Sequence, residues 1–254
     1  MRVAFVTHQL PDGRTDHGAG LLQGRYAGGA EMSTEELLAQ APEDFEVTVF
    51  RPEWGLPDAR QFDQVVVGAT ERLSDDDMAY LASWQPVVWV RSPQPQRAAQ
   101  LLSEASVLVM PSPEMVVWHD WVGRDIRVCP APMDTSLIPR GVEKEGFALW
   151  AGRDHPLKGK WDAIAWAMES GMKIVTLTNQ PREVVLEHMG RASVFVHLPH
   201  NHDPCPRTVI EAEIAGCDIV VNENVGRVPV RGADQVAAYV EGAAERFWEW
   251  VRDS

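Results

Sequence analysis

Residues 192–221, which read ASVFVHLPHNHDPCPRTVIEAEIAGCDIVV, decide the fold of this chain. Ser193–Leu198 is a short apolar run typical of a buried strand, and the proline-rich residues after it have the composition of a turn. Pro206 fits the opening of a helix and Gly216 fits its end. Cys217–Val221 is apolar again and predicts a second strand. The stretch therefore predicts a strand–loop–helix–strand unit of a parallel α/β sheet.

Two acidic residues in this unit are placed to bind polar groups. Asp203 lies in the loop before the expected helix, and Glu211 follows eight residues later, about a turn and a half into it. Such carboxylates accept hydrogen bonds from hydroxyl groups, while the helix N-terminus attracts an anion. Glu213, two residues beyond Glu211, is expected to point the opposite way, into solvent. An ordinary strand–helix unit with surface acids is the alternative interpretation.

The same residues resemble a known family motif. Asp203 and Glu211, followed by Ala215-Gly216, are similar to the E-x7-E motif of retaining glycosyltransferases with the GT-B fold, family 4 in particular. The resemblance implies that Asp203 contacts the donor sugar and that Glu211 holds the ribose of the nucleotide. Asp203 departs from the family pattern, because the family has the longer glutamate there.

Pro206 is a second departure from this family. It stands where the family usually has a glycine whose N–H reaches a phosphate, so one backbone donor is missing. Arg207 is expected to compensate for that loss. With Thr208 it is assigned to donor binding on the strength of the resemblance.

A second motif of the family follows the expected strand Phe147–Ala151. The next residues, GRDHPLKG, match the family pattern G-R-x4-K-G at Gly152, Arg153, Lys158 and Gly159. The resemblance implies that Arg153 and Lys158 hold the diphosphate of a nucleotide-sugar and that Gly152 lies at the donor. Negative charge grows on that diphosphate as the glycosidic bond breaks, and a guanidinium with an ammonium stabilises it without a metal ion. A βα loop with solvated basic residues is the alternative.

The N-terminal half predicts another parallel sheet. Apolar runs alternate with helical patterns, as in a sheet covered by helices on both faces; these runs are Arg2–Thr7, Phe45–Phe50, Gln64–Val67, Pro86–Val90, Val107–Met110 and Ile126–Cys129. After the first run comes a long segment, His8–Gly28, and then a helix that opens at Gly28-Gly29-Ala30-Glu31. These glycines are similar to the GGAE-type loop of the family, which implies that Gly29 lies under the reacting end of the donor.

The resemblance covers nearly the whole chain and implies an α/β protein of the GT-B fold, with two Rossmann-like domains facing each other across a cleft. The expected domains are residues 1–137, on the acceptor side, and residues 138–236, which bind the nucleotide-sugar donor. Three prolines within Pro130–Pro139 suit a stiff connection between them. Ala233–Ser254 is expected to be one long helix, of which residues 237–254 return to the first domain.

Two clusters have residue types that bind metals. Ser74-Asp75-Asp76-Asp77 contains the Asp-x-Asp pattern, but a serine followed by acids also suits the start of a helix, and we expect a helix cap there. The loop near Asp203 is rich in histidine, with His197, His200 and His202, but its spacing matches no structural zinc pattern. We therefore expect neither a metal ion nor a cofactor other than the nucleotide-sugar co-substrate.

Composition excludes several classes of protein. The 254 residues are 45% hydrophobic and 24% charged, as in a globular protein of one large or two small domains. The net charge of −14 argues against nonspecific binding to nucleic acid or to an anionic membrane. No apolar run is long enough for a transmembrane helix, and the N-terminal residues do not resemble a signal peptide. Three cysteines form no disulfide framework, so a cytoplasmic location is expected.

These observations predict a metal-independent retaining glycosyltransferase of the hexosyltransferase type, which moves a sugar from a UDP- or GDP-sugar to an acceptor. Retention of configuration is implied by the resemblance alone. Two alternatives remain: a nucleotide-sugar epimerase, and a protein that binds a nucleotide-sugar without transferring it. A virus-type enzyme that glycosylates DNA bases is a subsidiary alternative, against which the net charge argues. No residue pattern identifies the acceptor, the base, the sugar or the oligomeric state.

Overall fold

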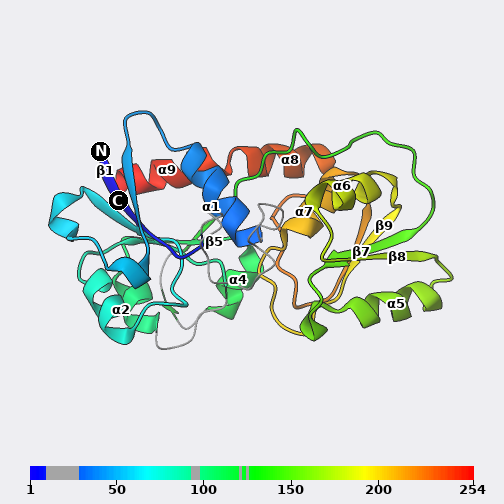
Figure 1. Cartoon of the computed structure of the whole chain (residues 1–254), viewed down its shortest axis with the longest axis horizontal. Coiled ribbons are helices and arrows are strands. Elements are labelled where there is room, and N and C mark those ends of the chain that lie inside the picture. The colour runs from blue at the N-terminus through cyan, green and yellow to red at the C-terminus, as the bar shows by residue number, and fades with distance from the viewer. Residues whose placement is uncertain (10–28, 93–97, 120–121, 124–125) are drawn as a thin grey trace. The chain divides into compact units, whose positions relative to one another are not determined.

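The computed structural model describes residues 1–9, 29–92, 98–119, 122–123 and 126–254 (Figure 1). The chain divides into two compact units, which we call unit 1 (Met1–Met133 and Gly242–Ser254) and unit 2 (Asp134–Glu241). The chain passes from unit 1 to unit 2 within the proline-containing segment, between Met133 and Asp134. The return lies between Glu241 and Gly242. The boundaries expected from the sequence, 137/138 and 236/237, lie four residues later and five residues earlier, respectively.

Unit 1 contains a six-stranded parallel sheet in the order β2-β1-β3-β4-β5-β6. The strands are β1 (Arg2–Val6), β2 (Glu46–Phe50), β3 (Gln64–Val67), β4 (Val87–Trp89), β5 (Val107–Met110) and β6 (Ile126–Val128). All six lie where apolar runs predict them. The chain adds β2 on one side of β1 and then β3 on the other, so the strand order reverses between β1 and β3.

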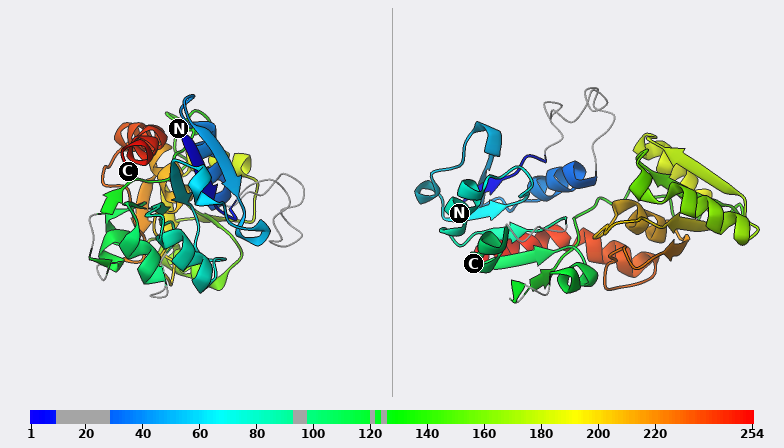
Figure 2. Two further views of the ribbon diagram at one scale, coloured as in Figure 1. Left: turned by 90° about the vertical axis from the view of Figure 1, so that its left-hand side faces the viewer. Right: turned by 90° about the horizontal axis from the view of Figure 1, so that it is seen from below.

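Helices cover both faces of this sheet (Figures 1 and 2). Val3 and Phe5 face α1 (Gly29–Ala39) and α9 (Ala243–Asp253) in one buried apolar cluster. The alternate residues of β1, Ala4 and Val6, belong to a second cluster on the opposite face, with side chains from α2 (Asp75–Ala82), α3 (Ala99–Glu104) and α4 (Pro113–Trp118). This alternation follows from the two-residue period of a strand. Short 3₁₀ helices at Pro52–Trp54 and Ala59–Gln61 complete the unit.

The C-terminal residues form two helices, so the prediction of one long helix is wrong. The first, α8 (Ala233–Glu241), belongs to unit 2, and the second, α9, belongs to unit 1. Gly242 lies between them, and glycine weakens a helix because it loses the most conformational freedom on ordering. The indole of Trp248 in α9 is buried and donates a hydrogen bond to the Leu37 carbonyl at 2.9 Å. The aromatic end of the chain is therefore packed against the protein itself, as expected.

The acidic run at the start of α2 is a helix cap. The Ser74 hydroxyl accepts a hydrogen bond from the Asp77 backbone N–H at 3.1 Å, and the Asp77 carboxylate accepts one from the Ser74 N–H at 2.9 Å. This reciprocal pair is a capping box. The helix-cap interpretation of Ser74–Asp77 is thus confirmed.

Unit 2 contains a four-stranded parallel sheet in the order β10-β9-β7-β8. Its strands are β7 (Ala148–Gly152), β8 (Ile174–Thr178), β9 (Val194–His197) and β10 (Asp218–Val221), and its helices are α5 (Lys160–Glu169), α6 (Arg182–Arg191), α7 (Arg207–Ile214) and α8. The predicted strand–loop–helix–strand unit is therefore confirmed as β9, α7 and β10. Here the strand order reverses between β7 and β9. None of the described helices is both long and apolar enough to cross a membrane.

Candidate functional site

The candidate site of unit 2 lies where its strand order reverses. In open parallel α/β sheets, ligands bind outside the carboxyl ends of the strands at such a reversal, because the loops there diverge to opposite sides of the sheet. β7 and β9 are the two strands concerned. Residues 153–159 follow β7 and residues 198–206 follow β9. Both sequence motifs therefore reach the one place in unit 2 where the topology favours a ligand.

Gly159 allows these two loops to approach each other. Its φ is +69°, and a Cβ atom there would lie 1.9 Å from the Leu198 carbonyl oxygen, far inside van der Waals contact. The loops are also joined by a hydrogen bond from the His200 N–H to the Leu157 carbonyl at 3.0 Å. The Trp150 indole, buried beneath, donates to the Lys158 carbonyl at 3.1 Å. Only glycine fits this position, which explains the second fixed glycine of the motif.

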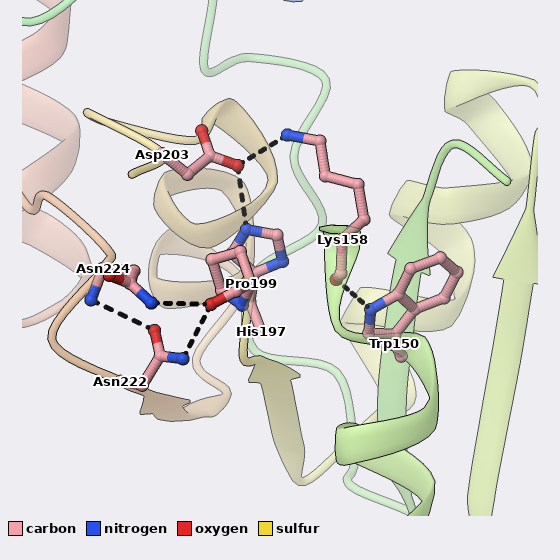
Figure 3. Close-up of polar contacts among 7 residues, drawn as sticks. All are labelled: Trp150, Lys158, His197, Pro199, Asp203, Asn222 and Asn224. Carbon is pink, nitrogen blue, oxygen red and sulfur yellow. Dashed lines mark hydrogen bonds and ion pairs between the residues drawn. The ribbon is translucent and has the colours of Figure 1, made fainter. Parts of the chain in front are cut away.

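Three side chains meet between the loops (Figure 3). The Lys158 ammonium donates to Oδ2 of Asp203 at 2.7 Å, although the two residues are 45 positions apart. His197, the last residue of β9, places Nε2 3.0 Å from the same oxygen. The His197 side chain is 4% exposed and that of Asp203 14%, whereas Lys158 is 36% exposed. The carboxylate is thus held from beneath by a buried ring and from the outside by a more exposed ammonium.

The loop that carries Asp203 is anchored through its backbone. The Asp203 N–H donates to the Asn224 carbonyl at 2.8 Å, and the Asp203 carbonyl accepts from the Gly226 N–H at 2.9 Å. The side-chain amides of Asn222 and Asn224 both donate to the Pro199 carbonyl, at 2.8 and 3.0 Å (Figure 3). The position of the carboxylate is therefore determined by the segment after β10 as well as by its own loop.

The surroundings of Asp203 keep it ionised. Burial raises the pKa of the carboxyl group, but the hydrogen bond from His197 and the charge of Lys158 oppose burial and lower the pKa from 3.8 to about 2. An opposite charge and hydrogen bonds to the charged form both favour ionisation. Asp203 is therefore a carboxylate at neutral pH and accepts hydrogen bonds.

Gly152 ends β7, and Arg153 begins the first loop. The Arg153 side chain is exposed and has no hydrogen-bond or ion-pair partner among the described residues. The Gly152 carbonyl accepts the Asn179 N–H at 3.0 Å, and a Cβ atom on Gly152 would approach the Trp150 ring to 3.1 Å. A cation without a partner at the end of a strand is available to bind an anion.

A second cluster surrounds Glu211 in α7. Its Oε1 atom accepts hydrogen bonds from Nε of Arg182 at 2.9 Å and from Nε of Arg207 at 3.1 Å. The Glu211 side chain is 4% exposed. Thr208 lies in the first turn of α7 and is partly exposed. The first backbone N–H groups of a helix have no partner within the helix, so this end of α7 can bind an anion.

Glu213 is buried, so the expectation that it points into solvent is wrong. Its carboxylate forms an ion pair with Arg227 at 2.6 Å and accepts the Gly232 N–H at 3.0 Å. The physical reason is that the segment before α8, which carries Arg227 and Gly232, covers the side that would otherwise face water. Because α7 also packs against α6, α8, β9 and β10, every residue from Val209 to Ile214 is buried.

Gly29 and the histidine-rich loop are the remaining parts of the sequence prediction. Gly29 is the first residue of α1, in unit 1, and its donor-binding role stays a prediction. The histidine-rich loop after β9 is divided between different partners, since His197 contacts Asp203 and His200 lies 2.7 Å from Asp162. Within the described part of the chain, no group of three or more His, Cys, Asp or Glu side chains is arranged to hold a metal ion.

Sequence reasoning missed the roles of His197 and Arg182. A histidine that ends a buried strand six residues before Asp203 was a recognisable signal for a partner of that acid. Arg182 begins the helix after β8 and carries no comparable signal, because its contact with Glu211 depends on how α6 and α7 pack.

No family model and no curated protein matches the sequence. Solved structures match along nearly its full length. AviGT4, described as a glycosyltransferase involved in avilamycin A biosynthesis, is 17% identical with a TM-score of 0.55, covering 99% of this chain and 97% of that one. HepE of Anabaena, in complex with UDP and glucose, is 12% identical with a TM-score of 0.55, covering 99% and 95%. Sucrose-phosphate synthase of Thermosynechococcus elongatus is 13% identical with a TM-score of 0.59, covering 99% and 91%.

At these identities the likeness is one of fold. The matched proteins have the GT-B fold, and this chain shares it, which confirms the fold class expected from the sequence. The likeness spans both units, since almost the whole chain is covered.

Proposed function

We propose that this chain is a glycosyltransferase that transfers a sugar from a nucleotide-sugar bound by unit 2. The observation that carries the proposal is the meeting of Lys158 and Asp203 at the reversal of the strand order, with the exposed Arg153 on the same loop as Lys158. Two cations and one carboxylate are the groups that a donor with a diphosphate and sugar hydroxyls requires. The glycosyltransferases with the same fold support this assignment.

The two cations would act on the leaving group. When the glycosidic bond breaks, its electron pair goes to the diphosphate oxygen, and negative charge grows there. An ammonium has three N–H donors, so Lys158 can keep its contact with Asp203 and still donate to a phosphate oxygen. Arg153 can bind two oxygens at once. Fixed positive charge of this kind stabilises the transition state without a metal ion, and we include metal independence and retention of configuration in the proposal.

The two acids would hold hydroxyl groups of the donor. On Asp203, Oδ2 is occupied by Lys158 and His197, so Oδ1 is the oxygen that would accept from the sugar. On Glu211, Oε1 is occupied by Arg182 and Arg207, so Oε2 would accept from the ribose. Thr208 and the start of α7 would bind the phosphate nearer the nucleoside, while the Arg207 side chain holds Glu211.

We propose a UDP-sugar as the first donor to test. HepE, which shares the fold, was solved with UDP and glucose and with UDP-glucose. A GDP-sugar is the second candidate from the sequence. All three cysteines lie in the described residues and are thiols rather than disulfides, which supports a reducing compartment such as the cytoplasm.

A thermal-shift panel with UDP, GDP, ADP, CMP and their common sugar conjugates tests the donor site. A ligand that binds only the folded protein raises its melting temperature by mass action. We expect one nucleoside diphosphate and its conjugates to raise it equally with and without EDTA, and the Lys158→Ala protein to show a smaller shift. No shift with any nucleotide would overturn the proposal.

Product analysis then separates the alternatives. Incubation with the donor that binds should release the nucleoside diphosphate, slowly to water and faster when an acceptor is present. An isomerised sugar that stays attached to the nucleotide would identify an epimerase instead. Binding without any release over a long incubation would identify a nucleotide-sugar-binding protein that does not transfer the sugar.

A further inference from the structure

Both contacts of the Asp203 carboxylate fall on one oxygen. Lys158 and His197 each contact Oδ2, at 2.7 and 3.0 Å (Figure 3). No hydrogen bond or ion pair from a described residue reaches Oδ1. The two carboxylate oxygens of Asp203 therefore differ in role. Oδ2 orients the group, and Oδ1 is left to accept a hydrogen bond from a ligand.

His197 has one form that suits this contact. Because Asp203 is a carboxylate, the hydrogen between the two groups belongs to Nε2 of the ring, which donates it. The other nitrogen, Nδ1, is buried without a hydrogen-bond partner. The geometry thus places a hydrogen on Nε2, from which the ring donates to Oδ2 of Asp203.

His197 and Lys158 differ in how firmly they are held. His197 ends β9, and its side chain is almost completely buried, so the ring has little freedom to move. Lys158 has a flexible stem, a more exposed ammonium and a proposed second task at the diphosphate. Because the Lys158 ammonium would also donate to a bound diphosphate, the buried ring of His197 is the contact on Oδ2 that has no other partner to serve.

We infer that His197 is a positioning residue, which donates from Nε2 to Asp203 and fixes the direction in which Oδ1 faces the donor sugar. This inference rests on the proposed function for its catalytic consequence. The arrangement of the two side chains can be tested without any substrate. His197 itself touches no reacting atom and acts through Asp203.

Two substitutions of His197 separate positioning from packing. Glutamine carries an amide N–H at about the reach of Nε2, whereas leucine has a similar volume and no donor. We expect His197→Leu to lower kcat/KM for the donor about 10- to 100-fold, since a misplaced group can cost that much. His197→Gln should recover most of this loss. Urea unfolding of both proteins checks that they fold. Equal kcat/KM values for the two variants, whether high or low, would overturn the inference.

The titration of Asp203 provides a readout that needs no activity. In carboxyl ¹³C NMR spectra of the ligand-free protein, we expect the apparent pKa of Asp203 to rise in His197→Leu and to stay near the wild-type value in His197→Gln, because the first loses the donated hydrogen bond. An unchanged titration in His197→Leu would show that the ring does not hold the carboxylate. A wild-type protein that transfers no sugar would refute the proposed function, while this titration would still decide the contact.

Discussion

In both units the strand order reverses between two neighbouring strands, but the cations near this reversal differ in how many of their donors make hydrogen bonds. In unit 1 the strand order reverses between β1 and β3, and Arg91, just after β4, links the segments that follow those strands. Its guanidinium donates to the Gly68 carbonyl at 2.8 Å, and to Gln9. The same group also bonds the first turns of α1, through the Ala30 carbonyl and the Thr34 hydroxyl, both at 2.7 Å. In unit 2, Lys158 has one carboxylate partner and Arg153 none among the described residues.

This difference separates a structural cation from a functional one. Arg91 also lies over the Trp89 ring at 4.2 Å, and burial lowers its pKa to about 10, against the opposing effect of Glu71 and Glu31. A cation whose donors are all used stabilises the fold and has nothing left for a ligand. Donors of Lys158 and Arg153 that remain unused stabilise unit 2 little and are available for an anion.

The largest effect is expected at Lys158. The Lys158→Met protein keeps the stem of the side chain but loses the ammonium, so the diphosphate leaving group loses a fixed charge. We expect kcat to fall about 10²- to 10³-fold, as when one donor to a developing anion is removed. Transfer assays with the donor identified by thermal shift measure this, and far-UV circular dichroism checks the fold. A fully active Lys158→Met enzyme would refute the assignment of the site.

The next effect is expected at the contact between the two loops of unit 2. Gly159→Ala places a Cβ atom 1.9 Å from the Leu198 carbonyl oxygen, so the backbone must move. We expect a loss of about 3 kcal/mol or more in the free energy of unfolding, together with a loss of transfer, because Lys158 is the neighbouring residue. Equilibrium unfolding in urea measures the free energy of unfolding.

Gly171→Ala is the matched control for this substitution. Gly171 has nearly the same backbone angle, with φ of +67°, and no atom within 4 Å of the position of the new Cβ. The control should therefore show only the conformational cost of a side chain at positive φ, about 1 kcal/mol. Equal losses in the two variants would show that the loop contact contributes nothing.

Arg91→Met tests the other side of the comparison. The substitution removes the hydrogen bonds of the guanidinium to the Gly68 and Ala30 carbonyls, and only Ala30 keeps a side-chain donor, the Thr34 hydroxyl. We expect about 3 kcal/mol lower stability of unit 1. Transfer per folded molecule should change far less than in Lys158→Met. Arg60→Met is the control, since that guanidinium is exposed and, among the described residues, hydrogen-bonds to Asp58 alone. If kcat fell strongly in Arg91→Met while the free energy of unfolding kept its wild-type value, Arg91 would have a functional rather than a structural role.

The sequence predicted most of this fold because its strands are nearly continuous apolar runs. β3 and β5 begin and end at the expected residues. The meeting of Lys158 and Asp203 was also predictable in outline, because both residues follow parallel strands at the same edge of a sheet. Periodicity predicts which side of a helix a residue occupies but not what covers that side. The prediction that Glu213 points into solvent is wrong for this reason. Likewise, the contacts of His197 and Arg182 depend on loop geometry and helix packing.

A smaller effect concerns stability in acid. Asp203 has a pKa of about 2 in the folded protein and 3.8 as the reference value for the unfolded chain. A lowered pKa stabilises the fold fully above 3.8, and this stabilisation is lost as the pH falls from 3.8 toward 2. The shift corresponds to about 2 kcal/mol. We expect the difference in unfolding free energy between the wild type and Asp203→Asn to shrink by about that amount between pH 6 and pH 2. A difference that does not change with pH would mean that Lys158 and His197 do not hold an ionised Asp203.

The smallest effect is expected in unit 1, at the capping box of α2. In Asp77→Ala the Ser74 N–H loses its carboxylate acceptor, and we expect the free energy of unfolding to fall by about 1 kcal/mol. Transfer should be unchanged, with or without EDTA, because the acids at this position stabilise a helix. If Asp75 and Asp77 instead bound a catalytic metal, the substitution and EDTA would each abolish transfer, and the cations of unit 2 could not be sufficient for the leaving group. This variant therefore tests from unit 1 whether positive charge at the diphosphate comes from Lys158 and Arg153 alone.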